Sequence, residues 1–247
     1  MNTAASNTTV EFRDVSFRIG GKQILSHLDI AVEAGETVVL LGRSGSGKTT
    51  ALKMVNGLVL PTGGQVLVEG KPTTTWDVVS LRRRIGYVIQ EVGLFPHFTV
   101  AQNVGLVPRL EGWEPARIER RVSELLDMLE LPPAQFLHRY PRELSGGQRQ
   151  RVGVARALAA DPPVLLFDEP FGALDPVTRH ETQRQFLRVT SGLGKTSIFV
   201  THDVREAMVL ATRIGLLRQG RLELLESPAG FARAEGEEAA AFRACLA

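Results

Sequence analysis

One short segment of the chain combines glycines, a lysine and a hydroxyl residue in an order that suits phosphate binding. It reads Gly42-Arg43-Ser44-Gly45-Ser46-Gly47-Lys48-Thr49 and fits the pattern G-x-x-x-x-G-K-[ST]. The glycines let the backbone curl so that successive N–H groups converge on phosphate oxygens. Lys48 can reach the β- and γ-phosphates of a nucleotide, and the hydroxyl of Thr49 is a ligand for Mg²⁺. The segment therefore predicts a nucleotide-binding loop.

The residues on either side of this loop support the prediction. The apolar, β-branched run at residues 37–41 predicts a strand that is buried on both faces. Residues 50–57 predict a helix. The N-terminal end of a helix is positive and favours an anion, so we count Thr50 with the nucleotide-binding residues. The alternative, a flexible Gly/Ser loop, does not explain both flanks.

A second candidate is a pair of acids that follows an apolar run. Residues 164–167 are apolar and lead directly into Asp168 and Glu169. In an open sheet, ligands bind at the carboxyl ends of the strands, which is where this pair is expected. Asp168 would orient Mg²⁺, and Glu169 would polarise an attacking water. Taken alone, the run could also be a strand that enters an exposed turn.

A third segment, Leu144-Ser145-Gly146-Gly147-Gln148, opens a predicted helix. Ser145 is a suitable N-cap, and the glycine amides at the helix start form another anion site. The alternative is an ordinary capped helix that binds no ligand.

In this order the three segments resemble the ABC-transporter ATPase family over nearly the whole chain. Arg149-Gln150-Arg151-Val152 continues the family pattern. The resemblance implies ATP and Mg²⁺ as cofactors. It also implies that Ser145, Gly146, Gly147 and Gln148 face the γ-phosphate of an ATP bound by a partner subunit.

The resemblance assigns roles to three further positions. Gln90 ends the apolar run at residues 85–89 and matches a glutamine that contacts Mg²⁺ and the water and senses the permease. Asp175 closes Gly172-Ala173-Leu174-Asp175, which resembles the loop that crosses between two subunits. His202 follows the run at residues 197–200 and matches the histidine that meets the γ-phosphate. A lone histidine is more often structural, but its place in this order favours a functional role.

These assignments form two groups. Catalysis is assigned to Glu169, His202 and Gln90, and the metal to Thr49, Gln90 and Asp168.

One position departs from the family pattern. Family members usually carry an aromatic residue near the first turn, where it stacks on adenine. In Val15-Ser16-Phe17-Arg18-Ile19-Gly20 that position is Ile19, and Phe17 lies two residues earlier on the same strand face. Ile19 is therefore the expected adenine contact, with Phe17 as the alternative.

The chain around these motifs reads as alternating strands and helices. Residues 10–19 alternate apolar and polar before Gly20-Gly21, which predicts antiparallel strands. Apolar runs recur with helical stretches between them, which favours a largely parallel α/β sheet. The runs are residues 65–68, 85–89, 164–167, 197–200 and 214–217. The last run turns at Gln219-Gly220 into a predicted hairpin.

The middle of the chain is predicted to be helical. After Pro115, an apolar stripe recurs at helical spacing up to Leu129, and Pro132-Pro133 is expected to end that helix. A second helix is expected from Ser145 to Ala160. The predicted fold class is α/β, a P-loop ATPase core with an N-terminal antiparallel β subdomain and an inserted helical subdomain.

The expected boundaries follow from these elements. Residues 1–230 form one domain, with its core at about 10–90 and 161–230 and the helical subdomain at about 91–160. Residues 231–247 form a short tail, expected to be helical.

Composition excludes several classes of protein. With 43% hydrophobic and 23% charged residues the chain is typical of a globular protein, and a net charge of +2 does not indicate a nucleic-acid binder. The single cysteine, Cys245, allows no intrachain disulfide. Residues 1–9 do not resemble a signal peptide, and no apolar run approaches the roughly 18–20 residues that span a bilayer.

The sequences of several segments are similar to those of ATPases of osmoprotectant importers, which take up glycine betaine, choline and related quaternary amines. These segments are residues 85–97, 139–143 and 168–176. The resemblance implies a second ATPase subunit in a homodimer, transmembrane permease subunits seated near residues 90–100 and a substrate-binding protein, with no nucleic acid. The chain would then lie at the cytoplasmic face of the cell membrane, held by the permease. The alternatives are an ATPase of another ABC importer or exporter, or a non-transport ABC ATPase.

Overall fold

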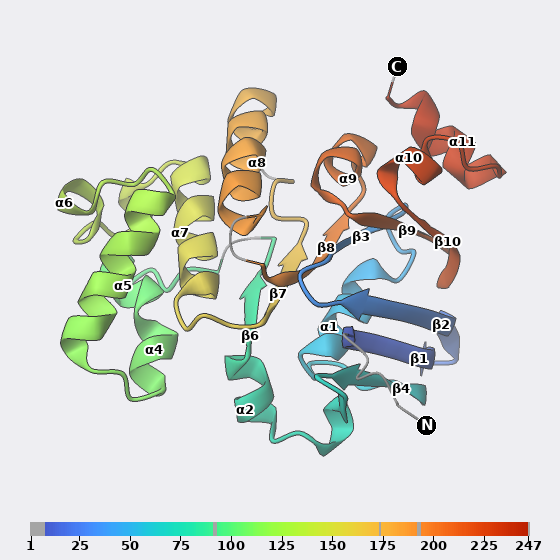
Figure 1. The fold of residues 1–247 in the computed structure, drawn as a ribbon, viewed down its shortest axis with the longest axis horizontal. Coiled ribbons are helices and arrows are strands. Elements are labelled where there is room, and N and C mark those ends of the chain that lie inside the picture. Colours follow the sequence, from blue (N-terminus) through green and yellow to red (C-terminus); the bar gives the residue numbers. More distant parts are fainter. Residues whose placement is uncertain (1–7, 91–92, 173, 192–193, 247) are drawn as a thin grey trace, which may run out of the picture. The chain divides into compact units, whose positions relative to one another are not determined.

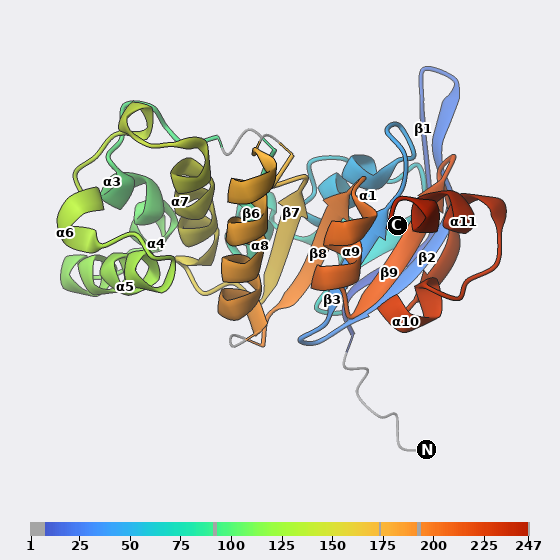
Figure 2. The same ribbon diagram turned by 90° about the horizontal axis from the view of Figure 1, so that it is seen from above.

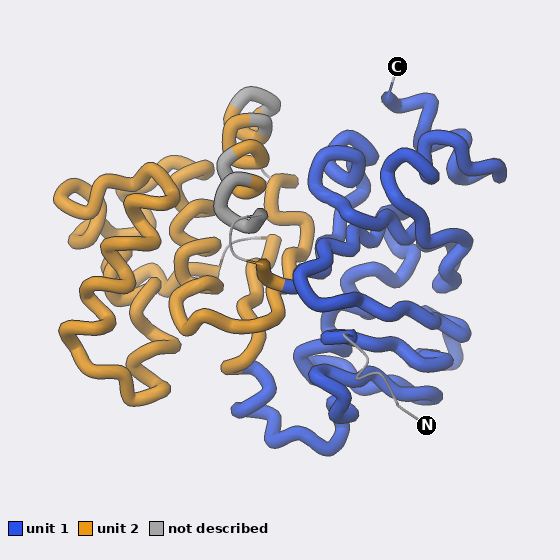
Figure 3. Tube along the Cα trace, in the orientation of Figure 1, with its two compact units in different colours: residues 1–82, 196–247 blue, residues 83–195 orange. Residues whose placement is uncertain are grey.

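The structure is a computed structural model that describes residues 8–90, 93–172, 174–191 and 194–246. The chain divides into two compact units, coloured separately in Figure 3. Unit 1 comprises residues 1–82 and 196–247, and unit 2 comprises residues 83–195. The expected helical subdomain at about 91–160 falls inside unit 2, and its bounds as a separate subdomain stay a prediction.

Unit 1 contains a four-stranded antiparallel sheet in the order β2-β1-β4-β5. Its strands are β1 (Thr8–Ile19), β2 (Lys22–Glu33), β4 (Gly63–Val68) and β5 (Lys71–Pro72). The first two strands form the predicted hairpin around Gly20-Gly21, and its far end projects from the rest of the unit (Figure 2).

One apolar run lies in a different setting from the one expected. Residues 65–68 were predicted to belong to the parallel sheet, and that prediction is wrong. They lie in β4, which pairs antiparallel with β1 in the register Val10↔Val68 and Phe12↔Val66. An apolar run reports burial but not its pairing partner. Here the pairing buries Val10, Phe12 and Val66 in one shared core.

The remaining strands of unit 1 carry the predicted phosphate loop. They are β3 (Thr37–Leu41), β8 (Thr196–Thr201), β9 (Arg213–Arg218) and β10 (Arg221–Glu226). β3 runs parallel to both β8 and β9, and β10 returns antiparallel to β9 through the predicted Gln219-Gly220 turn. Residues 38–41 of β3 are at most 1% exposed, which fits the prediction of a strand buried on both faces.

The helices of unit 1 connect and follow these strands (Figure 1). They are α1 (Lys48–Val55), the 3₁₀ helix η1 (Thr73–Thr75), α2 (Val78–Arg83), which ends at the unit boundary, α9 (Val204–Leu210), α10 (Pro228–Phe231) and α11 (Glu237–Ala244). Two expectations are confirmed here, a helix directly after the loop and a helix in the C-terminal tail.

Unit 2 combines two parallel strands with helices. The strands are β6 (Ile85–Val88) and β7 (Val164–Asp168), paired in the register Val88↔Phe167. The helices are α3 (Val100–Val104), α4 (Leu106–Leu110), α5 (Pro115–Met128), α6 (Pro133–Phe136), η2 (Pro141–Glu143), α7 (Gly146–Leu158) and α8 (Pro176–Ser191). The stretch between β6 and β7 is thus helical, as predicted.

The two helices predicted in this stretch are present with small differences at their ends. α5 begins at Pro115 but ends at Met128, before the expected stop at Pro132-Pro133. Glu130 has a φ of 54°, so the chain turns in a left-handed conformation there, and Pro133 begins α6. The second helix, α7, has Ser145 as its N-cap, as predicted.

Candidate nucleotide site

The loop at residues 42–49 is shaped by glycines at two close approaches. A Cβ atom at Gly42 would lie 2.3 Å from the carbonyl oxygen of Leu217 in the neighbouring β9. Gly47 has a φ of 103°, and a Cβ there would lie 2.6 Å from Leu25 Cδ2. Both positions therefore require glycine. Gly42 does so because β9 passes close by, and Gly47 does so because of its close neighbour and because L-residues rarely adopt its backbone conformation.

Lys48 is held at this loop by backbone groups. Its Nζ donates to the carbonyl oxygens of Gly42, at 2.7 Å, and Arg43, at 2.9 Å, and the residue is only 4% exposed. α1 begins at Lys48 with Gly47 as its N-cap. A glycine in the cap position offers no side-chain acceptor that would compete with a phosphate for the first amides of the helix. The arrangement fixes an ammonium group at the loop, which suits the predicted phosphate-binding role.

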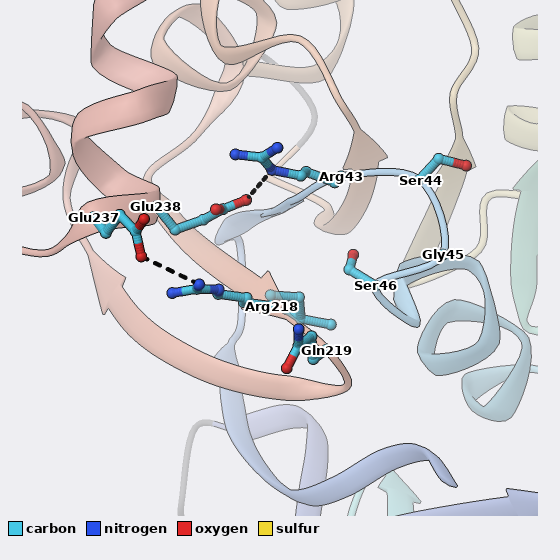
Figure 4. A pocket seen from close by; sticks show the side chains of 9 residues that line it. Arg43, Ser44, Gly45, Ser46, Arg218, Gln219, Glu237 and Glu238 are labelled. Carbon is cyan, nitrogen blue, oxygen red and sulfur yellow. Dashed lines mark hydrogen bonds and ion pairs between the residues drawn. The ribbon is translucent and has the colours of Figure 1, made fainter. Parts of the chain in front are cut away.

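Other residues of the loop line a cavity of about 410 Å³ on unit 1. Figure 4 shows this cavity with Arg43, Ser44, Gly45 and Ser46 on one side. Residues of β9, of the turn after it and of α11 complete its wall. Arg43 points toward α11, where its Nε donates to Glu238 Oε1 at 2.7 Å. Thr49 and Thr50 lie in the first turn of α1.

His202 lies at the same strand edge as this loop. Leu41 and Thr201 are register partners in the parallel strands β3 and β8, so the loop and His202 both leave the sheet at adjacent carboxyl ends. The exposed His202 is followed by Asp203, whose side chain caps α9 by accepting from the amide of Arg205 at 2.8 Å. The structure therefore brings together two of the predicted groups within unit 1.

A buried pair that the sequence reading missed supports the turn at His202. Thr201 Oγ1 donates to Glu206 Oε2 at 2.6 Å and accepts from the amide of Asp203 at 3.0 Å. Thr201 is 2% exposed and Glu206 is 4% exposed. A threonine five residues before a glutamate, at a strand-to-helix turn, is the sequence signal that could have indicated it.

In unit 2, parallel pairing places Gln90 and the acids at one edge. Val88 and Phe167 are register partners near the ends of β6 and β7, so Gln90, just after β6, and Asp168, the last residue of β7, lie at adjacent strand ends. A Cβ atom built at Gly172 would lie 3.9 Å from both Gln90 Nε2 and Glu169 Oε2. The side chains of Gln90 and Glu169 therefore border the same small space, which agrees with a shared role.

Asp168 has a partner that the sequence reading did not name. The hydroxyl of Tyr87 donates to Asp168 Oδ2 at 3.2 Å, and Asp168 is 8% exposed. Burial, together with the charge of Asp168 and this hydrogen bond, raises the pKa of Tyr87. Tyr87 therefore stays protonated and orients one oxygen of Asp168. In the sequence, only the position of Tyr87 near the end of β6 could have indicated this role.

The segment at residues 145–148 forms a capping box. Gln148 N donates to Ser145 Oγ at 3.2 Å, and Ser145 N donates to Gln148 Oε1 at 2.9 Å. A Cβ at Gly147 would lie 2.6 Å from Thr178 Cγ2, so glycine allows α7 to approach α8 at this point. A Cβ at Gly146 would lie 3.5 Å from Leu174, an ordinary contact. The capped helix start predicted from the sequence is present.

Asp175 and Ile19 occupy exposed positions. Asp175 Oδ1 accepts from the amide of Thr178 at 3.1 Å, so its side chain caps the start of α8. Ala173, in the loop predicted to cross between subunits, lies outside the described residues. Ile19 ends β1 and is 62% exposed, whereas Phe17 is half-buried.

The donors assigned to Mg²⁺ suit that ion in kind. They are the Thr49 hydroxyl, the Gln90 amide oxygen and the Asp168 carboxylate, which are hard oxygen ligands. Among the described residues no group of three or more His, Cys, Asp or Glu could hold a metal ion. A single carboxylate among the assigned donors suits a metal that is also held by substrate phosphates.

The family profile described as ABC transporter matches residues 25–172, more than half of the 247 residues. The chain therefore belongs to the ABC transporter family and has the α/β fold of its P-loop ATPase cassettes.

Several curated proteins are similar to this chain. The osmoprotectant import ATP-binding protein OsmV of Salmonella typhimurium is 53% identical over 204 residues, which cover 83% of this chain and 53% of that protein. The glycine betaine/carnitine/choline transport ATP-binding protein OpuCA of Bacillus subtilis is 48% identical, covering 85% and 57%. The glycine betaine uptake ATP-binding protein YehX of Escherichia coli is 49% identical, covering 86% and 69%. The chain thus spans little more than half the length of the first two.

Solved structures show the same fold. The dimeric bacterial ABC transporter cassette MJ0796 is 34% identical with a TM-score of 0.79, covering 89% of this chain and 98% of that one. The protein cbiO1 of Clostridium perfringens, part of the ABC transporter complex cbiONQ, is 27% identical with a TM-score of 0.82, covering 90% of this chain and 89% of that one. In the part of the chain that the structure describes, no helix has the length and apolar character needed to cross a membrane.

Proposed function

We propose that this chain is the ATP-binding and ATP-hydrolysing subunit of an ABC importer for a quaternary-amine osmoprotectant. The observation that carries the activity is the glycine-shaped loop in which Lys48 is fixed by two carbonyl oxygens at the start of α1. The substrate class is supported by the similar proteins, which are named for the import of osmoprotectants, glycine betaine, carnitine and choline.

The loop binds the phosphates of ATP. The backbone amides of residues 42–49 and the first amides of α1 donate to phosphate oxygens, and Lys48 neutralises charge at the β- and γ-phosphates. Arg43, Ser44 and Thr50 belong to this loop and helix start. Ile19, at the exposed end of β1, covers one face of the adenine.

Four side chains act on the reaction. Glu169 accepts a proton from the attacking water, and Gln90, which borders the same space, orients that water. His202 donates to the γ-phosphate. Asp168, held by Tyr87, would bind Mg²⁺ together with Thr49 and Gln90. When bound, Mg²⁺ supplies positive charge to the β- and γ-phosphate oxygens.

The active form is a pair of copies arranged head to tail. The chain carries each motif once, so the segment at residues 145–148 of one copy faces the ATP bound by the other, with Asp175 in the loop between them. The dimeric cassettes among the similar structures support a pair of copies. ATP binding closes the pair, and hydrolysis releases it.

An apolar hollow in unit 2 is the proposed seat of the permease. It has a volume of about 350 Å³, and its apolar wall includes Ile89, Phe95, Leu106 and Val107. Phe95 is 41% exposed and Ile89 is 36% exposed, so the hollow presents apolar side chains to solvent. A short permease helix would bury them, placing the chain at the cytoplasmic face of the membrane. A substrate-binding protein would deliver the solute on the other side.

Two experiments test this proposal. A strain lacking the gene should grow poorly in high salt with betaine, and the wild-type gene should restore growth, whereas Lys48→Ala should not. Equal growth of all strains with and without betaine would exclude this substrate class.

Purification from solubilised membranes should recover permease chains with the protein, and replacing Phe95 by Asp should remove them. Recovery of an exporter subunit instead would favour the alternative transporter.

A further inference from the structure

Charged side chains join the C-terminal helix α11 to the predicted phosphate loop and to β9. Arg43 Nε donates to Glu238 Oε1 at 2.7 Å, and Arg218 Nη2 on β9 donates to Glu237 Oε2 at 3.3 Å (Figure 4). All four residues line the cavity of about 410 Å³ beside the loop. The last described helix of the chain is thus in direct contact with the second residue of the loop.

The two pairs differ in burial, although they are adjacent on α11. The Glu238 side chain is 5% exposed, whereas that of Glu237 is 84% exposed. An exposed ion pair contributes little, because water and salt screen it. A buried carboxylate that loses its partner is costly. The buried Glu238 carboxylate therefore depends on its contact with Arg43, whose side chain is otherwise 70% exposed, whereas both side chains of the pair between Glu237 and Arg218 are exposed.

The same Arg43 residue holds Lys48 through its backbone. The carbonyl oxygen of Arg43 accepts from Lys48 Nζ at 2.9 Å and from the amide of Ser46 at 3.2 Å. The orientation of this peptide group therefore helps to set the position of the lysine ammonium, together with the carbonyl oxygen of Gly42. Fixing the side chain of Arg43 restricts rotation of the backbone that carries the acceptor.

We propose that Glu238 is a positioning residue for nucleotide binding, which acts through Arg43 on Lys48, so that α11 affects nucleotide affinity through this residue. This inference rests on the proposed role of the loop as the ATP site. Its physical basis is preorganisation, since a loop already held in its binding conformation loses less entropy when the phosphates arrive. Positioning of this kind changes nucleotide affinity and leaves the chemical step alone.

The direct test is Glu238→Gln in the full chain, measured by ATP dissociation constant, KM and kcat. We expect the dissociation constant and KM to rise about three- to tenfold, while kcat stays within about twofold. Glu237→Gln is the matched control, because it removes the same charge from the next residue of the same helix. Its nucleotide affinity should equal that of the wild type. Equal effects of the two variants would overturn the proposal in favour of a general charge effect.

A coupling measurement separates positioning from a loss of folding. Arg43→Gln breaks the contact from the loop side, and the double variant with Glu238→Gln should bind ATP no more weakly than the weaker single variant. Fully additive losses would contradict the proposed route through Arg43. The readings are taken below the unfolding temperature of each variant. Failure of the wild type to bind ATP would refute the proposed function itself, whereas normal binding by Glu238→Gln would refute this inference alone.

Discussion

Glu169 adopts a backbone conformation that is unusual for a side chain of its size. Its φ is 46°, in the left-handed region, directly after the buried strand β7. The amide of Gly172 donates to the carbonyl oxygen of Glu169 at 3.1 Å, which closes a tight turn. Such strain persists only when the surrounding structure imposes it, and it often marks a functional position. Here the turn places the Glu169 carboxylate in the space that Gln90 also borders.

Glu169→Gln tests the role of this carboxylate. The variant should bind ATP as the wild type does but hydrolyse it about 10²–10⁴-fold more slowly, the usual contribution of a positioned acid or base. It should also trap an ATP-bound dimer, visible by size-exclusion chromatography. Glu119→Gln, at an exposed position of α5, should leave turnover unchanged. Near-wild-type hydrolysis by Glu169→Gln would reject the assignment.

Ile19, the proposed adenine contact, leads to a prediction about base selectivity. An aliphatic side chain covers the adenine face without the π contact that an aromatic ring provides, which is worth about 1–3 kcal/mol per base. We therefore expect weak base selectivity, with appreciable GTP hydrolysis. Ile19→Tyr should tighten ATP binding by up to roughly tenfold.

Nucleotide dissociation constants for two variants decide between Ile19 and its alternative. If Phe17 stacks on the base, Phe17→Ala will weaken ATP binding and Ile19→Tyr will leave it unchanged. The half-burial of Phe17 and the 62% exposure of Ile19 favour Ile19 as the contact.

At the level of elements, a glycine in β6 sets the approach of α7. A Cβ atom at Gly86 would lie 2.4 Å from the carbonyl oxygen of Ala157 in α7 and 2.7 Å from Leu165 Cδ2 in β7. Because one of these neighbours is backbone, it cannot move without displacing the helix. This close packing holds α7, which begins at Gly146, against β6, which ends two residues before Gln90.

Gly86→Ala should therefore destabilise the protein. We expect the free energy of unfolding to fall by about 1–3 kcal/mol, the usual cost of overpacking. Gly63→Ala is the control, because its Cβ would lie 3.6 Å from Ser16 Cβ, an ordinary contact. The control should change the free energy of unfolding by less than about 0.5 kcal/mol. Urea denaturation of both variants measures the difference, and equal stabilities would show that α7 can shift freely.

A charged pair joins the start of β9 to the turn between β2 and β3. Arg213 donates two hydrogen bonds to the Glu36 carboxylate, one of them from Nη2 at 2.6 Å. Burial alone would raise the pKa of Glu36, but the hydrogen bonds from Arg213, the Glu33 backbone and Thr212, with the charge of Arg213, outweigh it and lower this pKa below 4.5. The pair contributes to the order of the sheet edge in unit 1.

The sign of this shift predicts a pH dependence. Because the folded-state pKa is lowered, the stabilisation is complete above about pH 4.5 and is lost as the pH falls through the folded pKa. The Glu36→Gln variant lacks this carboxylate. As the pH is lowered from about 5, its free energy of unfolding should therefore fall less than that of the wild type, by an amount that corresponds to the titration of one group. Urea unfolding at a series of pH values measures this. Glu235→Gln, at an exposed position, should follow the wild-type curve.

At the level of the whole molecule, each motif occurs once in the chain. Under the proposed function, a complete pair of ATP sites needs a second cassette, as in the similar dimeric structures. Lys48→Ala should damage the site of its own subunit, whereas Ser145→Arg should damage that of its partner.

Mixing these two variants tests the shared site. The mixed dimer can keep one site with an intact loop and an intact opposing segment, so ATPase activity should recover above that of either variant alone. The baseline is the activity of Lys48→Ala alone at the same total protein concentration. Normal hydrolysis by monomers of either variant would show that the sites are not shared.

Local chemistry made much of the candidate nucleotide site predictable from the sequence. The loop at residues 42–49 needs glycines, Lys48 and a hydroxyl at fixed spacing between a strand and a helix, and all of this lies within some twenty residues. The same holds for the capped start of α7 and for the acids at the end of β7, because caps and strand ends are decided by neighbours in the chain.

Only the tertiary structure decided which distant side chains meet these groups. Tyr87 reaches Asp168 across 81 positions because β6 and β7 pair in one register, and Glu238 reaches Arg43 across 195 positions because α11 returns to the loop. The run at residues 65–68 joined the antiparallel sheet for the same reason. Periodicity reports how deeply a segment is buried, but the choice of partner depends on the packing of the whole unit, which no local pattern contains.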